Sequence, residues 1–180
     1  MPDRVAFFHQ YPKLPEIINH HTDVEFSLRS YFNCSAPGLS ARFANYIESE
    51  VADELQVRLA EQERITVFNI LSSLEAAFRV DFLQRCYKKK KDLLSKGFRE
   101  LHNKKGSRVA LEDEILEKWK EHTSVSNKLI GDLKGAFKYR HWLAHGRYWE
   151  PKLGQKYNYE DVYLLAQTIF NSFPLEGLGV

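Results

Sequence analysis

The chain has few cysteines and no long apolar stretch. Only two of its 180 residues are cysteine, Cys34 and Cys86, and neither belongs to a CxxC pair. A thiolate zinc site or a disulfide scaffold needs more, so we expect both thiols to be small buried apolar groups. No uncharged apolar run approaches the roughly 20 residues that cross a bilayer, and the first residues lack the apolar stretch of a signal peptide. We therefore expect no membrane partner and a location in a reducing cytoplasm.

Signatures of several common enzyme classes are also missing. The sequence contains no Walker phosphate loop, no GxSxG elbow, no Rossmann glycine set and no HExxH. Two histidine groups are the only hints of metal ligands: His20 and His21 beside Asp23, and His141 with His145 at HxxxH spacing. A zinc site would need a third ligand at either place. We expect neither a metal nor a cofactor.

The chain has little net charge, but its basic residues are concentrated in one region. The formal net charge is only +2, which argues against a protein that coats nucleic acid. Lys88 to Lys91 nevertheless form an unbroken basic run. Further basic residues follow it: Lys96, Arg99, His102, Lys104, Lys105 and Arg108. Contact with RNA phosphates and a solvated helix face both explain this pattern.

What the chain does contain is apolar residues at helical spacing. Its hydrophobic fraction of 43% suffices for a buried core. Apolar stripes predict helices over 39–59, from residue 63 with a continuation as far as 101, and over 111–122, 129–145 and 158–173. Asn158 is expected to cap the last helix, and Gly146 to stop the one before it. The pattern predicts an all-α bundle of four or five helices over 39–180.

Residues 1–38 differ from the rest. They hold four of the six prolines, and no helical stripe runs far through them. Alternating apolar residues from Val24 to Phe32 are compatible with a short strand or with one or two helical turns. We expect an N-terminal extension that packs on the helical core or on a partner subunit.

The segment RHWLAHGRYW, from Arg140 to Trp149, carries the densest set of reactive groups. Metal-free cleavage of RNA needs a base, an acid and a cation for the developing phosphorane charge; histidine suits the proton transfers and arginine suits the phosphate. One Arg and one His are too few for both proton transfers, but a two-fold dimer would double the set. On an ideal helix Arg140 and His145 lie roughly 140° apart. They can therefore meet only if the helix ends at Gly146 or if a partner chain completes the site.

Arg140, four residues and His145 resemble the R-x4-6-H signature of the HEPN superfamily. The longer string resembles the motif region of its RiboL-PSP-type members, and Glu75 and Arg79 are similar to polar residues on an earlier helix of such proteins. The resemblance implies a HEPN-like bundle that dimerises into a metal-independent endoribonuclease, often a toxin or an antiphage defence protein with an antitoxin partner. Arg140 and His145 would then be catalytic. Supporting or substrate-binding roles would fall to the following residues: His141, Arg147, Tyr148, Glu75 and Arg79.

Simpler explanations compete at each position. Arg140 and His145 are also what a helix C-terminus attracts to balance its dipole, and Glu75 with Arg79 is an i, i+4 ion-pair spacing. Some HEPN toxins carry a modified tyrosine two residues after the histidine, where this chain has Arg147. The alternative function is a non-catalytic HEPN-like module that binds RNA or protein, or a regulatory subunit.

Overall fold

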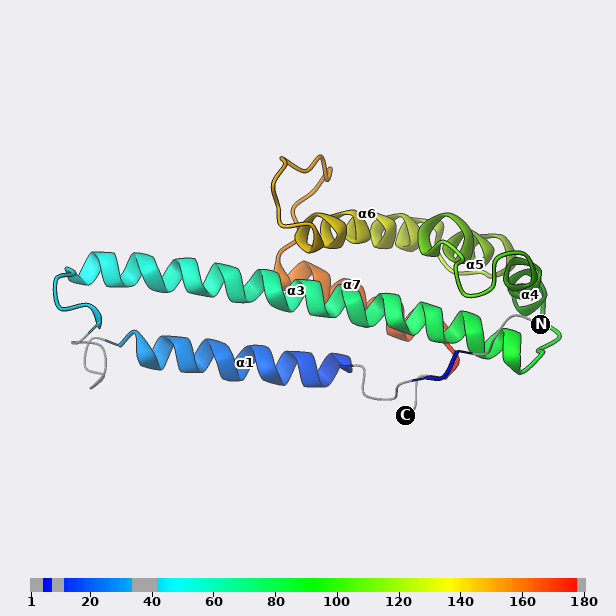
Figure 1. Cartoon of the computed structure of the whole chain (residues 1–180), viewed down its shortest axis with the longest axis horizontal. Helices are drawn as coiled ribbons and strands as arrows, with labels where there is room; N and C mark the ends of the chain where they lie inside the picture. The colour runs from blue at the N-terminus through cyan, green and yellow to red at the C-terminus, as the bar shows by residue number, and fades with distance from the viewer. Residues whose placement is uncertain (1–4, 8–11, 34–41, 178–180) are drawn as a thin grey trace.

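The computed structural model of the chain describes residues 5–7, 12–33 and 42–177, and every regular element in these ranges is helical. Its α-helices are, in chain order, α1 (Leu14–Tyr31), α3 (Glu48–Tyr87), α4 (Leu93–Lys105), α5 (Leu116–His122), α6 (Asn127–Ala144) and α7 (Tyr159–Ser172) (Figure 1). A π-helical turn, Leu111–Ile115, runs directly into α5. The predicted all-α class is confirmed. Of the six α-helices in the described ranges, five lie within 42–177, which agrees with the four or five predicted over 39–180, and α1 belongs to the N-terminal extension.

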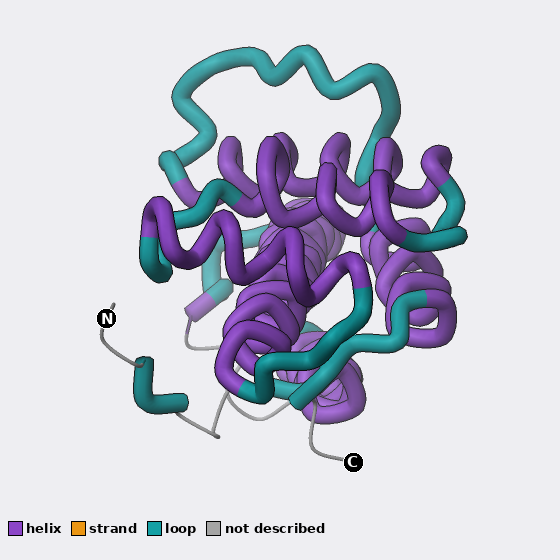
Figure 2. Tube along the Cα trace, turned by 90° about the vertical axis from the view of Figure 1, so that its right-hand side faces the viewer, coloured by secondary structure: helices purple, strands orange, loops and turns teal. Residues whose placement is uncertain are grey.

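Helix α3 is the centre of the bundle. It contacts α1, α4, α6 and α7, and its 40 residues span about 60 Å at 1.5 Å per residue. Helix α1 lies antiparallel beside its first part, and α4, α5 and α6 lie over its second part (Figure 1). Figure 2, which looks along the length of α3, shows the shorter helices grouped around it. The loop 145–158 projects from this group between α6 and α7.

The predicted break between two helices near residues 60–63 is wrong. The structure has one helix from Glu48 to Tyr87, because this range contains no glycine or proline to interrupt the backbone where the apolar stripe shifts. The predicted start at Leu39 lies outside the described residues. Ile47, an apolar residue within the predicted 39–59 helix, is the exposed residue that precedes α3.

The predicted continuation of this helix through the lysine run is also wrong. Helix α3 ends at Tyr87, and Lys89 then adopts a positive φ of 51°. Asp92 begins α4 by accepting a hydrogen bond of 2.9 Å from the Ser95 N–H. An N-cap of this kind fixes a new helix start, so the apolar residues on either side belong to two helices.

The part of the N-terminal extension that the structure describes is dominated by α1. Its 18 residues settle the alternative left open by the sequence in favour of a helix, with Pro15 in the first turn, where a missing N–H costs nothing. Ile17 is buried in the main core, so α1 is packed against α3. The predicted boundary between residues 38 and 39 lies outside the described residues.

The main core lies between α3 and the helices that cover its second half. Phe78 and Trp119 meet edge to face, as do Phe78 and Phe173. The largest fully buried side chains are Trp119, Phe78, Phe82, Phe98, Ile70, Leu71, Leu74, Ile115, Leu116, Ile130, Leu133 and Ile169. A second, smaller apolar cluster lies where α1 ends and α3 begins, and consists of Phe32, Phe43 and Val51. The bundle is thus held mainly around one half of α3.

Cys86 is a buried apolar group, as the sequence predicts. It is buried in the main core, and burial raises the pKa of its thiol to about 12. Cys34 lies outside the described residues. None of the helices that the structure describes is long and apolar enough to cross a bilayer.

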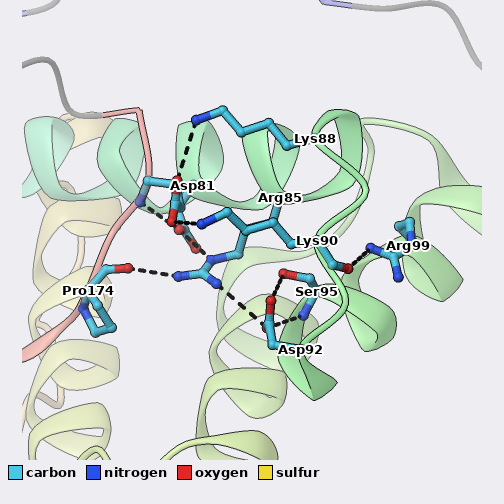
Figure 3. Close-up of polar contacts among 9 residues, drawn as sticks. Asp81, Arg85, Lys88, Lys90, Asp92, Ser95, Arg99 and Pro174 are labelled. Atoms are coloured by element: carbon cyan, nitrogen blue, oxygen red, sulfur yellow. Dashed lines mark hydrogen bonds and ion pairs between the residues drawn. The ribbon is translucent and has the colours of Figure 1, made fainter.

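The C-terminal segment is attached to α3 by a buried ion pair (Figure 3). The Arg85 Nε donates to Asp81 Oδ1 at 2.7 Å, and its Nη2 donates to the Pro174 carbonyl, also at 2.7 Å. The Glu176 N–H donates to the same Asp81 oxygen at 2.8 Å. Lys88 and Lys90 pair with the Glu176 carboxylate. These contacts fix residues 174–176 against the end of α3.

Candidate functional site

The segment Arg140–Trp149 spans the last turn of α6 and the loop that follows. Helix α6 stops as the sequence predicts, because Gly146 adopts φ +79° directly after His145. Arg147 also has a positive φ of 58°, and its N–H donates to the Trp142 carbonyl at 3.2 Å. The backbone therefore reverses immediately after the predicted catalytic histidine. Asn158 likewise caps α7, accepting a hydrogen bond from the Asp161 N–H at 2.8 Å.

The Arg140 guanidinium points at α3. Its Nη1 lies 2.7 Å from Glu75 Oε2, and its Nε donates to Ser72 Oγ at 3.1 Å. The guanidinium carbon is 5.5 Å from the centre of the Phe68 ring, a cation–π distance. The side chain keeps 29% of its surface exposed. Arg140 is thus fixed in orientation while part of its fork remains open to a ligand.

Glu75 joins two arginines. Its Oε1 accepts from Arg79 Nε at 2.8 Å, while its Oε2 contacts Arg140. Arg79 also donates from Nη1 to the Val109 carbonyl at 3.3 Å. The predicted i, i+4 ion pair of Glu75 with Arg79 therefore exists together with a contact between Glu75 and Arg140, since the carboxylate has one oxygen for each.

His141 and His145 lie side by side and exposed to solvent. Their ring centres are 4.2 Å apart, and the His141 ring is 6.1 Å from that of Trp149. Among the described residues no hydrogen bond or ring contact joins Arg140 to His145. This agrees with the helical angle between them. Within one chain the structure brings His141, and not His145, to the same pocket as Arg140.

The aromatic residues of the segment divide into two kinds. Trp142 donates from Nε1 to the Trp149 carbonyl at 2.7 Å and stacks on Tyr139, so it fixes the loop to α6. Tyr139 in turn stacks on Tyr157. Tyr148 is 84% exposed and touches the edge of Trp149. Tyr148 is therefore the ring of this segment that is most accessible to an unpaired base.

Arg147 is bound to α3 rather than free. Its Nη1 lies 2.6 Å from Glu61 Oε2, and Arg64 contacts the same carboxylate oxygen at 3.1 Å. The hydrogen bond from Arg147 lowers the pKa of Glu61, and the carboxylate raises the pKa of Arg147. A substrate phosphate would have to compete with Glu61 for this guanidinium.

A pocket of about 660 Å³ opens beside Arg140. Helix α3, the π-helical turn, helix α6 and the following loop all contribute to its walls. Its lining residues are Glu75, Arg79, Ala110, Leu111, Glu112, Asp113, Phe137, Lys138, Arg140, His141, Trp142, Trp149, Pro151, Lys152 and Leu153. Its size lies within the range of small-molecule sites.

Glu112 is a pocket residue that sequence reasoning missed. It sits in the π-helical turn Leu111–Ile115, a geometry that often occurs at functional sites. Burial, followed by repulsion from Asp113, raises the pKa of its carboxyl, while Lys134 and Lys138 lower it. The apolar stripe of this segment predicts a helix, and the only signal for Glu112 is the acidic run of residues 112–114.

The basic run is partly neutralised by the protein itself. Besides Lys88 and Lys90, which pair with Glu176, Lys105 lies 2.7 Å from Glu114. Arg99 donates to the Lys90 carbonyl at 2.5 Å. These internal contacts favour a structural and solvating role for much of the run over a continuous phosphate-binding strip.

The histidines of α1 do not form a ligand set. His21 is buried, its Nδ1 is 2.9 Å from Thr66 Oγ1, and its ring lies 4.2 Å from that of Tyr159. Within the ranges that the structure describes, no three His, Cys, Asp or Glu side chains are placed to hold a metal ion together. His21 is therefore explained by packing between α1, α3 and α7.

Comparison of this chain with family models, with curated proteins and with solved structures finds no match. Any assignment of the chain to a family therefore depends on its own residues alone. The resemblance of Arg140–Trp149 to the HEPN motif stays a prediction from the sequence.

Proposed function

We propose that this protein is a metal-independent endoribonuclease of the HEPN type, with Arg140 and His145 as its catalytic residues. The observation that carries the proposal is the setting of Arg140. Its guanidinium is oriented by Glu75 and Ser72 at the wall of a 660 Å³ pocket. The exposed His141 lines the same pocket, and the His145 ring lies 4.2 Å from that of His141, outside the pocket. Such a site offers an oriented phosphate-binding group beside histidines, the side chain best suited to proton transfer in catalysis.

The proposed reaction is attack by the ribose 2′-oxygen on the adjacent phosphorus. One histidine removes the 2′-hydroxyl proton as the 2′-oxygen–phosphorus bond forms, and a second, protonated histidine gives its proton to the departing 5′-oxygen. The products are a 2′,3′-cyclic phosphate and a 5′-hydroxyl. Arg140 stabilises the charge that develops on the phosphorane oxygens, a contribution that depends on donors held in place beforehand.

A second copy of the chain would complete this site. Arg140 points toward α3, while His145 lies exposed at the helix end, where a neighbouring molecule can approach it. A two-fold axis close to His145 would set two copies of the segment across one groove and supply both proton-transfer groups. A role as a toxin or defence protein, held in check by an antitoxin, follows the same resemblance. The Glu61-bound Arg147 stands in place of the modified tyrosine of some HEPN toxins, so a different form of control is expected.

A non-catalytic module that binds RNA or protein, or a regulatory subunit, is the second candidate. The observation in its favour is that Arg140 already has two partners of its own chain, Glu75 and Ser72. A purely structural arginine would make the same contacts. This candidate requires no proton transfer, so histidine substitution separates it from the first.

The test is cleavage of single-stranded RNA in EDTA by the purified protein. We expect wild type to generate 2′,3′-cyclic phosphate ends and His145→Ala to lose at least about a hundredfold in rate, a loss within the range of general acid–base catalysis. Arg140→Lys should also be strongly impaired, since an ammonium cannot reproduce the planar fork. His20→Ala, an exposed histidine on α1, is the matched control and should cleave as wild type does.

Overexpression of the same variants gives a readout in cells. Growth arrest by wild type and normal growth with His145→Ala would support the nuclease. Full RNA cleavage by His145→Ala would reject the assigned histidine, and loss of wild-type activity in EDTA would reject the metal-free mechanism. RNA binding without cleavage, unchanged by His145→Ala, would favour the non-catalytic module.

A further inference from the structure

The pocket beside Arg140 is lined by charges of both signs. Helices α3 and α6 contribute Arg79 and Arg140, whereas the π-helical turn contributes the carboxylates of Glu112 and Asp113. A site for a phosphate alone would be weakened by those carboxylates. The pairing fits a ligand that carries an anionic group at one end and hydrogen-bond donors at the other.

Glu112 lacks the partners that Glu114 has. Glu114, two residues on, accepts a hydrogen bond from the Ala110 N–H at 2.8 Å and pairs with Lys105. The half-buried Glu112 carboxylate, by contrast, makes no hydrogen bond or ion pair within the described chain. Partial burial of a carboxylate that accepts no hydrogen bond is unfavourable, so an incoming pair of donors would be stabilised there. Two lysines, Lys134 and Lys138, are close enough to favour its charged form.

Aromatic rings complete the pocket. Trp142 and Trp149 both line it, and the hydrogen bond from Trp142 Nε1 to the Trp149 carbonyl holds the two segments together. Because Trp142 already stacks on Tyr139, an unpaired nucleobase would stack on the aromatic surface that remains, that of Trp149 in particular. The pocket thus offers a guanidinium, a stacking surface and a free carboxylate within one cavity.

We propose that this pocket binds a guanine base, with Glu112 accepting its N1–H and its exocyclic amino group. Guanine is the only one of the four RNA bases with two adjacent, parallel donors on its Watson–Crick edge, which is what the two oxygens of one carboxylate require. The inference rests on the proposed function in one respect: the phosphate of the bound nucleotide is the one that Arg140 contacts. The expected substrate class is therefore single-stranded RNA with an unpaired guanosine at the cleavage site.

The test is calorimetric titration of the full chain with nucleoside 3′-monophosphates. Guanosine 3′-monophosphate should bind roughly tenfold to a hundredfold more tightly than the adenosine, cytidine and uridine compounds, as the loss of charge-assisted hydrogen bonds predicts. Inosine 3′-monophosphate, which lacks only the exocyclic amino group, should fall between them. This comparison uses wild-type protein throughout, so it does not depend on the folding of a variant.

Substitution then assigns the preference to one side chain. Glu112→Gln should reduce the affinity for guanosine 3′-monophosphate to that for the adenosine compound, because an amide offers only one acceptor. Asp132→Asn, which removes an exposed carboxylate of α6 outside the pocket, should bind as wild type does. Equal affinity for all four compounds, or a guanosine preference that survives Glu112→Gln, would overturn the inference.

The outcomes distinguish this inference from the proposed nuclease. Selective, Glu112-dependent binding without RNA cleavage would support the base pocket and reject the nuclease. Cleavage without preference for guanosine, together with unselective binding, would support the nuclease and reject the base pocket.

Discussion

Arg140 stabilises the bundle as well as facing the pocket. It joins α6 to α3 through Glu75, Ser72 and the Phe68 ring, which are contacts that a helix-end cation acting on the dipole alone would not make. A dipole interaction contributes about 0.3–1 kcal/mol, whereas removal of a partly buried charge partner costs about 1–3 kcal/mol. Arg140→Ala should therefore lower stability noticeably. For this reason Arg140→Lys, checked for folding, is the better variant for activity measurements.

Asp81 is the residue whose protonation should be visible in the stability of the fold. Burial raises its pKa from 3.8 to about 6, against the opposing effect of Arg85. Between these pH values the native state holds a proton that the unfolded state has lost. Binding of this proton therefore stabilises the folded state. The stabilisation is fully present below pH 4 and is lost as the pH rises through 6.

Urea unfolding of wild type and Asp81→Asn at pH 4, 5, 6 and 7 checks this prediction. The difference in unfolding free energy, wild type minus variant, should fall by on the order of 2–3 kcal/mol between pH 4 and pH 7. Asp132→Asn controls for the loss of one exposed carboxylate. A difference that stays constant, or that rises with pH, would show that Asp81 does not titrate in this way.

At the scale of elements, α3 has two unlike halves. From Thr66 onward it supplies most of the main core, but before Thr66 only Val51 of this helix is buried. Among the described helices, α1 lies along that first part (Figure 1), and α7 reaches only its end, where the Tyr159 N–H donates to Glu63 at 3.0 Å. An isolated helix pair with a three-residue apolar cluster has little buried surface to hold it. The first half should therefore open more readily than the second.

Amide hydrogen exchange of the native protein measures this difference directly. Amides in residues 52–62 should exchange at least about tenfold faster than those in 70–82, which corresponds to a gap of about 1.4 kcal/mol in opening free energy. The second half of the same helix serves as the internal control. Equal protection along the whole of α3 would contradict the prediction.

At the scale of the molecule, the candidate site is assembled from distant parts of the sequence. Residues of α3, of the π-helical turn, of α6 and of the loop before α7 meet around one pocket. His145 lies outside it, at a helix end where a second copy could approach. If the proposed nuclease is correct, its active site needs two copies of the chain, and one copy alone should not cleave RNA.

Subunit dilution tests whether RNA cleavage requires a dimer. When wild type is exchanged with a ninefold excess of His145→Ala, random pairing leaves about one tenth of the wild-type chains in wild-type dimers, so cleavage should fall to about one tenth. Light scattering should report a dimer throughout. Activity that is unchanged by the excess, or a monomeric active protein, would show that each chain carries a complete site.

The sequence by itself determined the features that depend on neighbouring residues. The all-α class, the cap at Asn158 and the end of α6 at Gly146 follow from helical spacing and from backbone preferences over a few positions. The separation of Arg140 from His145 is of the same kind, because it follows from the rotation per residue of a helix. The position of Arg140–Trp149 at a helix end was therefore predictable without the structure.

Only the tertiary structure decided what meets across the bundle. The contact of Arg140 with Glu75 and the presence of Glu112 in the same pocket both depend on packing between segments far apart in the chain. Spacing along one helix carries no information on which face of another helix it meets. Apolar stripes show which side of each helix is buried, but the bundle alone sets which polar groups lie beside Arg140.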